Sequence, residues 1–400
     1  MVTIGLIREG KIPFDNRVAL IPAQCKWLQK NFPEIRILVQ SSPHRCFSDK
    51  EYQKAGVEVV EDIAEADVFF GIKEVPILAI IPHKTYLLFS HTKKQQRYNQ
   101  AMFHHMVANK ITLIDYECLE HADGQRLLGF GFFAGVVGAH NGMMAFGERT
   151  GLYHLERVYI QHCFRQLIHT YFGLKLPKIK VAITGSGRVA HGLLEVMNLM
   201  GIIEVEPEEY LARPFDYPVF TQLKGSHLYL HKNNVSYNRA DFHANPQDYA
   251  CSFRQYSRVT DILLNGIYWE PSMPRLFEWE QLAESDFRIQ TIADITDDKD
   301  GSVPCNLGDQ SIEQPVYGVD KLTRKMTAPY LPGSIDVMAV GNLPNELPRD
   351  ASRYFGEQLI KFVLEELFRG NSRLIEGATL LKEGALTKQF MYLKAYSGGA

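Results

Sequence analysis

Residues Lys178–Met197 read KIKVAITGSGRVAHGLLEVM, and this stretch decides the fold class of the chain. An apolar run, Ile179–Thr184, leads into a Gly-x-Gly-x-x-Ala turn at Gly185–Ala190, and apolar residues at helical spacing follow. A strand, a glycine turn and a helix in this order form the context in which the glycine pattern binds dinucleotide phosphates. The segment therefore predicts the opening of a doubly wound α/β domain that holds a dinucleotide.

Each position of the glycine turn has a steric reason. Gly185 permits the tight turn, Gly187 lets a pyrophosphate approach the backbone, and Ala190 allows the helix to pack closely on the strand. The helix N-terminus offers free amides and the positive end of its dipole to the phosphates. A tight turn that binds nothing is the alternative, and the complete context favours binding. We expect the cofactor along Gly185, Ser186, Gly187, Arg188, Val189 and Ala190.

The residues beyond the turn bear on the choice between NAD and NADP. A carboxylate about 20 residues further on holds the ribose hydroxyls in NAD-binding domains of this kind. Glu206 falls in that window, with Glu204 nearby. Arg188, directly after the turn, would instead suit the 2′-phosphate of NADP. We favour NAD and leave NADP open.

Composition and charge limit the class of protein. The 400 residues suggest two domains, and a formal net charge of -3 gives no reason to expect nucleic acid or a membrane surface as partner. The six cysteines lack any Cys-x-x-Cys pair or zinc-like spacing, and no apolar run approaches a membrane span. We expect a cytoplasmic monomer or small homo-oligomer with small-molecule partners, reduced thiols and no metal.

Alternating apolar runs and helical stretches predict two doubly wound, Rossmann-like domains with a cleft between them. The expected domains are residues 1–137 with 326–400, for substrate and catalysis, and residues 138–325, for the dinucleotide. Helices are expected at 135–151 and 156–172, and a final helix at 352–368 is expected to pack back on the first domain. The predicted strands are VTIGLI, RILVQ, VFFGI, TYLLFS and ITLIDY, then IKVAIT, ILLNGI and IQTIADI.

Titratable residues directly follow three strands of the first domain. Lys73 and Glu74 come after VFFGI, and His91 comes after TYLLFS. Asp115 and Glu117 close the run ITLIDYE, and Arg17 lies in the loop after the first strand. Any one of these residues alone could be an ordinary solvated surface group. Ligands, however, collect at the carboxyl ends of strands in a doubly wound sheet, so residues at three such ends together favour a functional site. A lysine there becomes a useful base when burial or neighbouring cations lower its pKa.

Longer motifs carry a resemblance to a known family. RVALIP near the start, before the glycine turn, resembles the alanine dehydrogenase and transhydrogenase superfamily. From residue 2 to about residue 365 the chain looks like lysine-2-oxoglutarate reductase, a family that includes lysine-forming saccharopine dehydrogenase. The motifs that carry this likeness are SHTKKQQ from Ser90, GFGFFAGVVGA from Gly129, LLNGIYWEPSMPRL from Leu263, IADITDDKDGS from Ile292 and NLPNELPRDASRYFG from Asn342.

The resemblance implies a function for individual residues. Lys73 and His91 match the acid/base pair, Glu74 and Glu117 match carboxylates that tune it, and Lys94 matches a lysine near the cofactor. The implied reaction interconverts saccharopine with lysine plus 2-oxoglutarate by hydride transfer with NAD or NADP. Groups that hold saccharopine are matched by Arg17, Arg126 and Phe130, and the nicotinamide end is matched by Ile267, Tyr268, Asp298, Asn342 and Leu343.

One departure from the family keeps other functions open. The family usually has Asp-Asn-Leu-Pro or Asp-His-Leu-Pro where this chain has Gly341-Asn342-Leu343-Pro344. The alternative enzyme is another amino-acid or opine-type dehydrogenase, similar to alanine dehydrogenase. A second alternative, from a different class, is a protein that binds NAD(P) without catalysis and senses redox state. A panel of substrate pairs with NADH and NADPH separates these functions.

Overall fold

The computed structural model describes residues 2–122 and 124–399, and its contacts divide the chain into two compact units. Unit 1 comprises Met1–Phe130 with Pro348–Ala400, and unit 2 comprises Gly131–Leu347. These limits differ from the expected domain boundaries, because residues 131–137 and 326–347 fall in unit 2. The strands β15 and β16 account for the second difference, since both pair within the sheet of unit 2.

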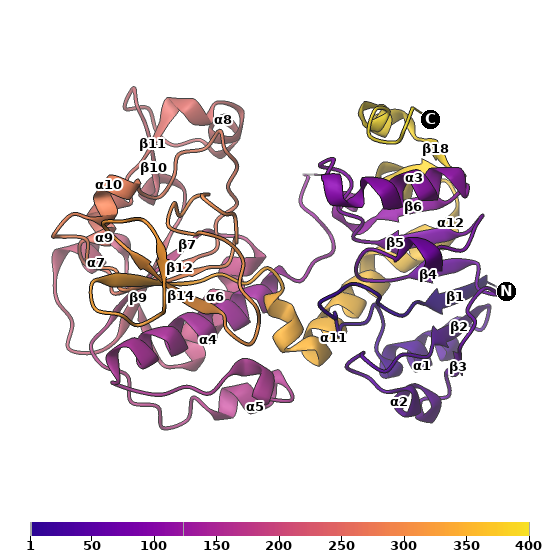
Figure 1. The fold of residues 1–400 in the computed structure, drawn as a ribbon, viewed down its shortest axis with the longest axis horizontal. Helices are drawn as coiled ribbons and strands as arrows, with labels where there is room; N and C mark the ends of the chain where they lie inside the picture. Colours follow the sequence, from indigo (N-terminus) through magenta and orange to yellow (C-terminus); the bar gives the residue numbers. More distant parts are fainter. Residues whose placement is uncertain (1, 123, 400) are drawn as a thin grey trace. The chain divides into compact units, whose positions relative to one another are not determined.

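Unit 1 is built on a mixed sheet in which the first and last parts of the chain lie side by side. The strand order is β18-β17-β6-β5-β4-β1-β2-β3. Strands β1 to β6 run parallel, and the C-terminal β17 and β18 add antiparallel at one edge (Figure 1). The strands are β1 Val2–Leu6, β2 Ile35–Gln40, β3 Glu58–Val60, β4 Val68–Phe70, β5 Thr85–Leu88, β6 Thr112–Asp115, β17 Thr379–Lys382 and β18 Ala385–Leu386.

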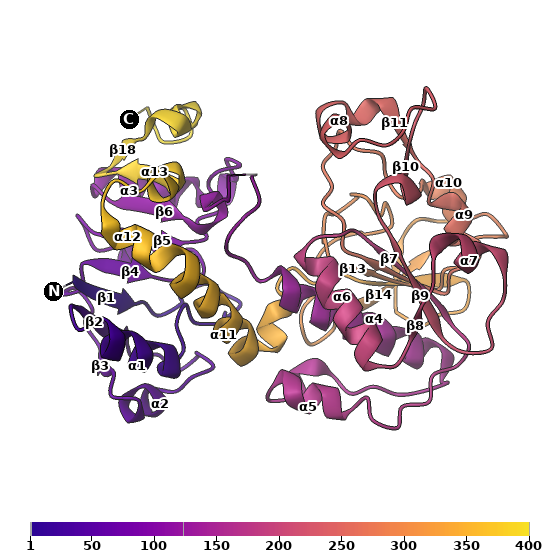
Figure 2. The same ribbon diagram turned by 180° about the vertical axis from the view of Figure 1, so that it is seen from behind.

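A long helical segment from the C-terminal part of the chain covers one face of this sheet (Figure 2). It contributes Phe355, Leu359 and Val363, all fully buried, to the core of unit 1. The expected C-terminal helix is thus confirmed, but it starts earlier and contains a π-helical turn. The helical elements are α1 Pro22–Asn31, α2 Asp49–Lys54, α3 Gln100–Ala108, α11 Pro348–Leu359, the π-turn Ile360–Leu364, α12 Glu365–Arg369 and α13 Arg373–Ala378, with 3-10 turns Ile77–Ala79, Arg97–Asn99, Tyr116–Cys118 and Lys388–Leu393.

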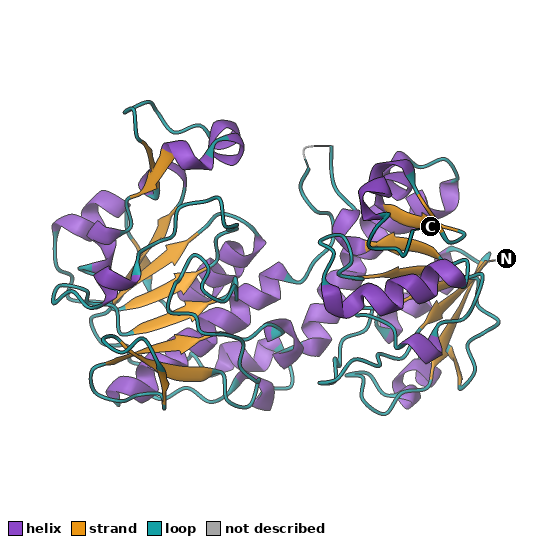
Figure 3. Ribbon diagram, turned by 45° about the horizontal axis from the view of Figure 1, so that its top comes forward, coloured by secondary structure: helices purple, strands orange, loops and turns teal. Residues whose placement is uncertain are grey.

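Unit 2 is built on a second, mainly parallel sheet with helices on its faces (Figure 3). The strand order is β15-β14-β16-β13-β12-β7-β9-β8, and β14 pairs antiparallel with both of its neighbours, β15 and β16. A separate two-stranded ribbon joins β10 to β11. The strands are β7 Lys180–Thr184, β8 Ile203–Glu204, β9 Val219–Leu223, β10 Tyr229–His231, β11 Tyr249–Cys251, β12 Ile262–Asn265, β13 Thr291–Asp294, β14 Val316–Asp320, β15 Met326–Thr327 and β16 Ser334–Met338.

The helices α4 and α6 of unit 2 cross at glycines. Any larger residue there would force the backbone of one helix to move. A Cβ atom on Gly135 would lie 2.0 Å from the carbonyl oxygen of Val189, and one on Gly192 would lie 2.0 Å from that of Phe132.

The expected helix at 156–172 is not continuous, because only Val158–Ile160 and α5 are helical there. The helices are α4 Gly131–Thr150, α5 Phe164–His169, α6 Arg188–Leu199, α7 Pro207–Ala212, α8 Arg239–Ala244, α9 Arg254–Ser257 and α10 Trp279–Leu282, with 3-10 turns Val158–Ile160, Gly225–His227, Pro246–Asp248 and Leu343–Glu346.

In the part of the chain that the structure describes, none of the helices combines the length and the apolar character that crossing a bilayer requires.

Candidate functional site

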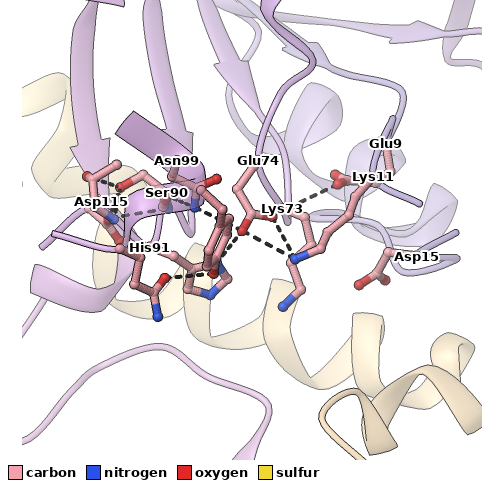
Figure 4. Close-up of polar contacts among 12 residues, drawn as sticks. Glu9, Lys11, Asp15, Lys73, Glu74, Ser90, His91, Asn99 and Asp115 are labelled. Carbon is pink, nitrogen blue, oxygen red and sulfur yellow. Dashed lines mark hydrogen bonds and ion pairs between the residues drawn. The ribbon is translucent and has the colours of Figure 1, made fainter. Parts of the chain in front are cut away.

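The three strand ends singled out in the first domain are neighbours in the sheet of unit 1. β4, β5 and β6 are adjacent and parallel, so their carboxyl ends lie at one edge. There the Nδ1 atom of His91 donates a hydrogen bond of 2.7 Å to the Oε1 atom of Glu74 (Figure 4). The sequence expectation that titratable groups meet at this edge is therefore met by this pair.

Glu74 is the centre of this group (Figure 4). The ammonium of Lys11 lies 3.1 Å from its Oε2 atom, and the amide of Asn99 donates to its Oε1 atom at 3.1 Å. Burial opposes ionisation of Glu74, but the hydrogen bond and charge of His91 outweigh it and hold the pKa of the carboxyl well below its ordinary value. Glu74 is consequently an anion that fixes the orientation of the His91 ring.

His91 itself has an unusual backbone. Its φ angle is 50°, in the left-handed region that residues other than glycine rarely adopt. The side-chain amide of Asn99 also donates a 2.9 Å hydrogen bond to the carbonyl of the preceding Ser90. The sequence reasoning missed Asn99, because it lies in a 3-10 turn far from any predicted strand end. Contacts from Asn99 to both Glu74 and Ser90 help to hold the strained turn.

Lys73 lies in surroundings that favour its neutral form. Burial and the nearby positive charges of Arg17 and Lys11 lower the pKa of Lys73 to about 8, against the opposing effect of Asp15 and Glu74. A lysine with this pKa is partly unprotonated near neutral pH and can accept a proton from a substrate. The condition that the sequence analysis set for a useful lysine, burial with neighbouring cations, is fulfilled.

Arg17 is buried and already has a carboxylate partner within the protein. Its Nε and Nη2 atoms donate to the two oxygens of Asp15 at 2.9 and 2.5 Å, and its guanidinium stacks on the ring of Phe130, 4.1 Å from the centroid. Burial opposes the charge of Asp15, but Arg17 holds the pKa of that carboxyl at about 2. Arg17 and Phe130 thus lie together, while direct binding of substrate by Arg17 stays a prediction.

Glu9 is a functional candidate that the sequence reasoning missed. Its Oε1 and Oε2 atoms accept hydrogen bonds from the backbone amides of Ile72 at 2.6 Å and Lys73 at 2.9 Å. Complete burial, with the charge of Asp15, raises the pKa of Glu9 to about 8. Glu9 follows the first strand, so the strand-end rule used for the other residues would have found it. The residue positions the backbone on which Lys73 stands.

Asp115 also supports the geometry of this sheet edge. One carboxylate oxygen accepts a hydrogen bond from the Ser90 hydroxyl and from its amide at 3.2 Å, and the other accepts from the amide of Glu117 at 2.8 Å. Burial, with the charge of Glu117, raises the pKa of Asp115 to about 6. These bonds tie the end of β5 to the end of β6.

The remaining predicted residues of unit 1 follow β5 and β6. Glu117 forms an ion pair of 3.3 Å with Arg126, whose side chain is 42% exposed. Lys94 is exposed in the loop that follows His91. Arg126 is accessible to a ligand, and its accessible charge suits a carboxylate.

The glycine turn of unit 2 has the geometry that its sequence predicts. Gly185 has a φ angle of 102°, and a Cβ atom there would lie 2.5 Å from the carbonyl oxygen of Gly266. Gly187 directly precedes α6, and a Cβ atom on it would meet nothing within 4 Å. Ala190 is fully buried. Open space at Gly187 in front of a helix N-terminus fits a bound pyrophosphate.

The residues expected near the nicotinamide follow strands on one side of β7. Ile267 and Tyr268 follow β12, and Ile267 is buried whereas Tyr268 is exposed. Asp298 is exposed after β13, and Asn342 and Leu343 follow β16. Since β7, β12, β13 and β16 are consecutive and parallel in the sheet, all these residues lie at the same sheet edge as the glycine turn.

Glu206 is not next to the glycine turn. It follows β8, the outermost strand, whereas the strand that pairs with β7 on this side is β9. The expectation placed the carboxylate at the end of the neighbouring strand, but the chain inserts β9 between β7 and β8. The residue that follows the neighbouring strand is therefore Lys224.

Gly341, the departure from the family pattern, faces two carboxylates. Its amide donates a 2.6 Å hydrogen bond to Asp309, and a Cβ atom on it would lie 2.9 Å from Asp297 and 3.1 Å from Asp309. Burial and the charge of Asp309 raise the pKa of Asp297 to about 8. Carboxylates from elsewhere in unit 2 thus take the room that a side chain at position 341 would need.

Comparison with solved structures defines the class of fold. The chain superimposes on an L-alanine dehydrogenase with a TM-score of 0.66 at 16% identity, covering 98% of this chain and 99% of that one. A transhydrogenase from Sinorhizobium meliloti gives a TM-score of 0.59 at 14% identity, covering 96% and 98%. The expected α/β class with two Rossmann-like domains is confirmed by the first of these matches.

Comparison of sequences identifies relatives of the chain. Residues 5–137 match the family described as alanine dehydrogenase/PNT, N-terminal domain. The mitochondrial alpha-aminoadipic semialdehyde synthase of Mus musculus is 30% identical over 98% of this chain and 47% of its own length. The saccharopine dehydrogenase [NAD(+), L-lysine-forming] of Candida glabrata is 26% identical over 90% of both chains. These proteins are homologues of the chain, which spans about half the length of the semialdehyde synthases.

Proposed function

We propose that this chain is an oxidoreductase that interconverts saccharopine with lysine plus 2-oxoglutarate, using a nicotinamide dinucleotide. The observation that carries the proposal is the pair of proton carriers at one sheet edge of unit 1, where Lys73 has a pKa of about 8 and His91 is held by ionised Glu74. The printed names of the homologues, a saccharopine dehydrogenase and semialdehyde synthases, support the choice of substrate.

The glycine turn of unit 2 fits the cofactor. A Cβ atom on Gly187 would meet nothing within 4 Å, so phosphates can approach the backbone there, and the N-terminus of α6 adds the positive end of its dipole. Ile267, Asn342 and Leu343 stand at the same sheet edge and would contact the nicotinamide end. When bound, the dinucleotide supplies the acceptor or donor of a hydride.

The residues of unit 1 account for the proton transfers. In the lysine-forming direction, neutral Lys73 accepts the proton of the secondary amine of saccharopine, and loss of a hydride from the adjacent carbon leaves an imine. His91, whose Nδ1 proton is held by Glu74, accepts a proton from the water that attacks the imine. Collapse of the resulting carbinolamine releases lysine and 2-oxoglutarate, one proton and the reduced dinucleotide. Positioned proton transfer of this kind contributes about 10²–10⁴-fold.

Charged groups of unit 1 suit a substrate with several carboxylates. Arg126 is accessible and pairs with Glu117 at 3.3 Å, and the ammonium of Lys11 lies near Glu74 with 36% of its side chain exposed. Arg17 holds Asp15 and stacks on Phe130, so it shapes the site from a buried position. We assign carboxylate binding first to Arg126 and then to Arg17.

The test is a panel of substrate pairs followed by absorbance of the reduced dinucleotide at 340 nm. Oxidation of NADH or NADPH that requires both lysine and 2-oxoglutarate supports the proposal. Oxidation with pyruvate and ammonia, or with another keto acid and amine, identifies a different amino-acid or opine-type dehydrogenase. Dinucleotide binding without consumption by any pair contradicts the enzymatic proposal and identifies a binding protein.

A further inference from the structure

The strand order of unit 2 determines which residues stand beside the adenosine end of a dinucleotide. In doubly wound domains the 2′-position of the adenosine ribose is read by the residue at the carboxyl end of the strand adjacent to the glycine-turn strand. Here that strand is β9, and its last residue, Leu223, is in register with Thr184 at the end of β7. The position is therefore occupied by Lys224.

Lys224 is connected to the glycine turn by a chain of hydrogen bonds. The amide of Gly185 donates to the carbonyl of Leu223 at 3.0 Å, and the side-chain amide of Gln222 donates to the carbonyl of Gly185 at 2.9 Å. The ammonium of Lys224 in turn donates to the Oε1 atom of Gln222 at 2.9 Å. Gln222 thus holds the lysine ammonium on the side of the strand that faces the turn.

The sequence at the end of β9 has no carboxylate that would bind the two hydroxyls of an unphosphorylated ribose. Residues 219–226 read VFTQLKGS. In the preceding segment, Glu206 follows β8, and Glu208 forms an ion pair of 3.4 Å with His227 in the 3-10 turn after Lys224. A cation replaces the expected anion at the position that distinguishes the two dinucleotides.

Arg188 is the other cation near the turn, but its position suits a different role. It begins α6, and its Cβ atom lies 3.2 Å from the place that a Cβ atom on Gly131 of α4 would occupy. The base of the side chain therefore faces α4, while Lys224 extends from β9. Any contact of Arg188 with the pyrophosphate would be common to NAD and NADP.

We infer that Lys224, held by Gln222, is the specificity-determining residue of the cofactor site and selects a dinucleotide with a 2′-phosphate, NADP(H), over NAD(H). This inference rests on the proposed function only for the existence of a dinucleotide site. It replaces the preference for NAD that Glu206 suggested. A lysine is a point charge that suits phosphate, and the interaction is strengthened because both groups are ionised.

The experiment measures binding directly, without turnover. Dissociation constants of the full chain for NADPH, NADH, 2′,5′-ADP and 5′-AMP are obtained by calorimetry or by fluorescence of the reduced nicotinamide. We expect NADPH to bind at least tenfold more tightly than NADH, and 2′,5′-ADP more tightly than 5′-AMP. In Lys224→Ala the NADPH advantage falls at least tenfold while NADH affinity stays within twofold, and Lys224→Arg keeps most of the advantage.

Two matched variants complete the design. Lys232→Ala removes an exposed lysine of the same unit, whose ammonium donates to the carbonyl of Gln247, and leaves both affinities unchanged. Arg188→Ala weakens both dinucleotides alike. Equal affinity of the unaltered chain for NADH and NADPH, a preference for NADH, or an equal loss of both in Lys224→Ala overturns the inference and leaves the proposed function standing. Absence of binding by either dinucleotide overturns the proposed function itself.

Discussion

The hydroxyl of Tyr396 donates a 2.7 Å hydrogen bond to the backbone carbonyl of Gln96. Tyr392, one turn earlier, donates at 3.0 Å to the carbonyl of Lys93. Both tyrosines belong to the C-terminal segment of unit 1, and both carbonyls belong to the loop that follows His91. The end of the chain, which lay beyond the family motifs, therefore restrains the loop that carries a proposed acid/base residue.

Removal of the Tyr396 hydroxyl is expected to loosen this loop. Tyr396→Phe should lower the free energy of unfolding by about 1 kcal/mol, the usual net value of one hydrogen bond. The turnover number should fall severalfold with little change in the Michaelis constant, since the ring still packs near Phe103. Urea unfolding and steady-state kinetics measure both effects. Tyr159→Phe, at an exposed tyrosine of unit 2, is the control, and equal effects in both variants would contradict a restraint by Tyr396.

The two proposed proton carriers can be removed without changing the size of the side chains much. Lys73→Met and His91→Gln should each lower turnover by about 10²–10⁴-fold, because positioned proton transfer is lost. Dinucleotide affinity should stay within twofold, since the residues of the glycine turn all belong to unit 2. Stopped-flow single turnovers and fluorescence titration provide the two readouts. Unchanged turnover in both variants would refute the assignment.

The pKa of Lys73 predicts the pH dependence of saccharopine oxidation. Burial with the charges of Arg17 and Lys11 lowers this pKa to about 8, so the neutral, proton-accepting form increases as pH rises through 8. The rate at low substrate concentration should therefore rise about tenfold for each unit of pH below 8 and level off above it. A profile of kcat/KM from pH 6 to pH 10 measures this. Persistence of the same limb in the residual activity of Lys73→Met would assign it to another group.

The acid/base edge could be predicted from the sequence because its logic is local. Lys73, Glu74 and His91 directly follow apolar runs that become β4 and β5, and strand ends of a parallel sheet meet at one edge. Asn99 could not be found in this way. It reaches Glu74 only because the chain after His91 folds back through a 3-10 turn.

The cofactor side shows where local patterns are insufficient. The turn Gly185–Ala190 was recognised from its strand and helix, but β9 was not, because a run of five residues between Pro218 and Lys224 has no distinct periodicity. The position of Glu206 depends on whether β8 or β9 pairs with β7, and that pairing is a tertiary choice. The strands β15 and β16 were missed for the same reason, which shifted the expected domain boundary.

The raised pKa of Asp297 makes the stability of unit 2 depend on pH. Its folded-state pKa of about 8 exceeds the ordinary value of 3.8, so the folded protein retains a proton that the unfolded chain loses. The free energy of unfolding should then fall as pH rises from about 4 to about 8. Asp297→Asn, which is neutral at every pH, should remove this slope and stabilise the protein by about 2 kcal/mol at pH 8. Chemical unfolding at pH 6 and pH 8 tests this, and an unchanged slope would contradict the role of Asp297.

Restoring the family aspartate at position 341 should be unfavourable in this chain. A side chain there would begin within 2.9 Å of Asp297 and 3.1 Å of Asp309, so Gly341→Asp adds both crowding and a further acidic group beside these two. We expect a loss of stability of about 2 kcal/mol, within the range for overpacking. Thermal and urea unfolding measure the loss. Asp309→Asn combined with Gly341→Asp should recover part of it, because one repulsion is removed, and Gly341→Ala separates crowding from charge. Full stability of Gly341→Asp would show that the two carboxylates can move away. It would contradict the interpretation that they exclude a side chain at position 341.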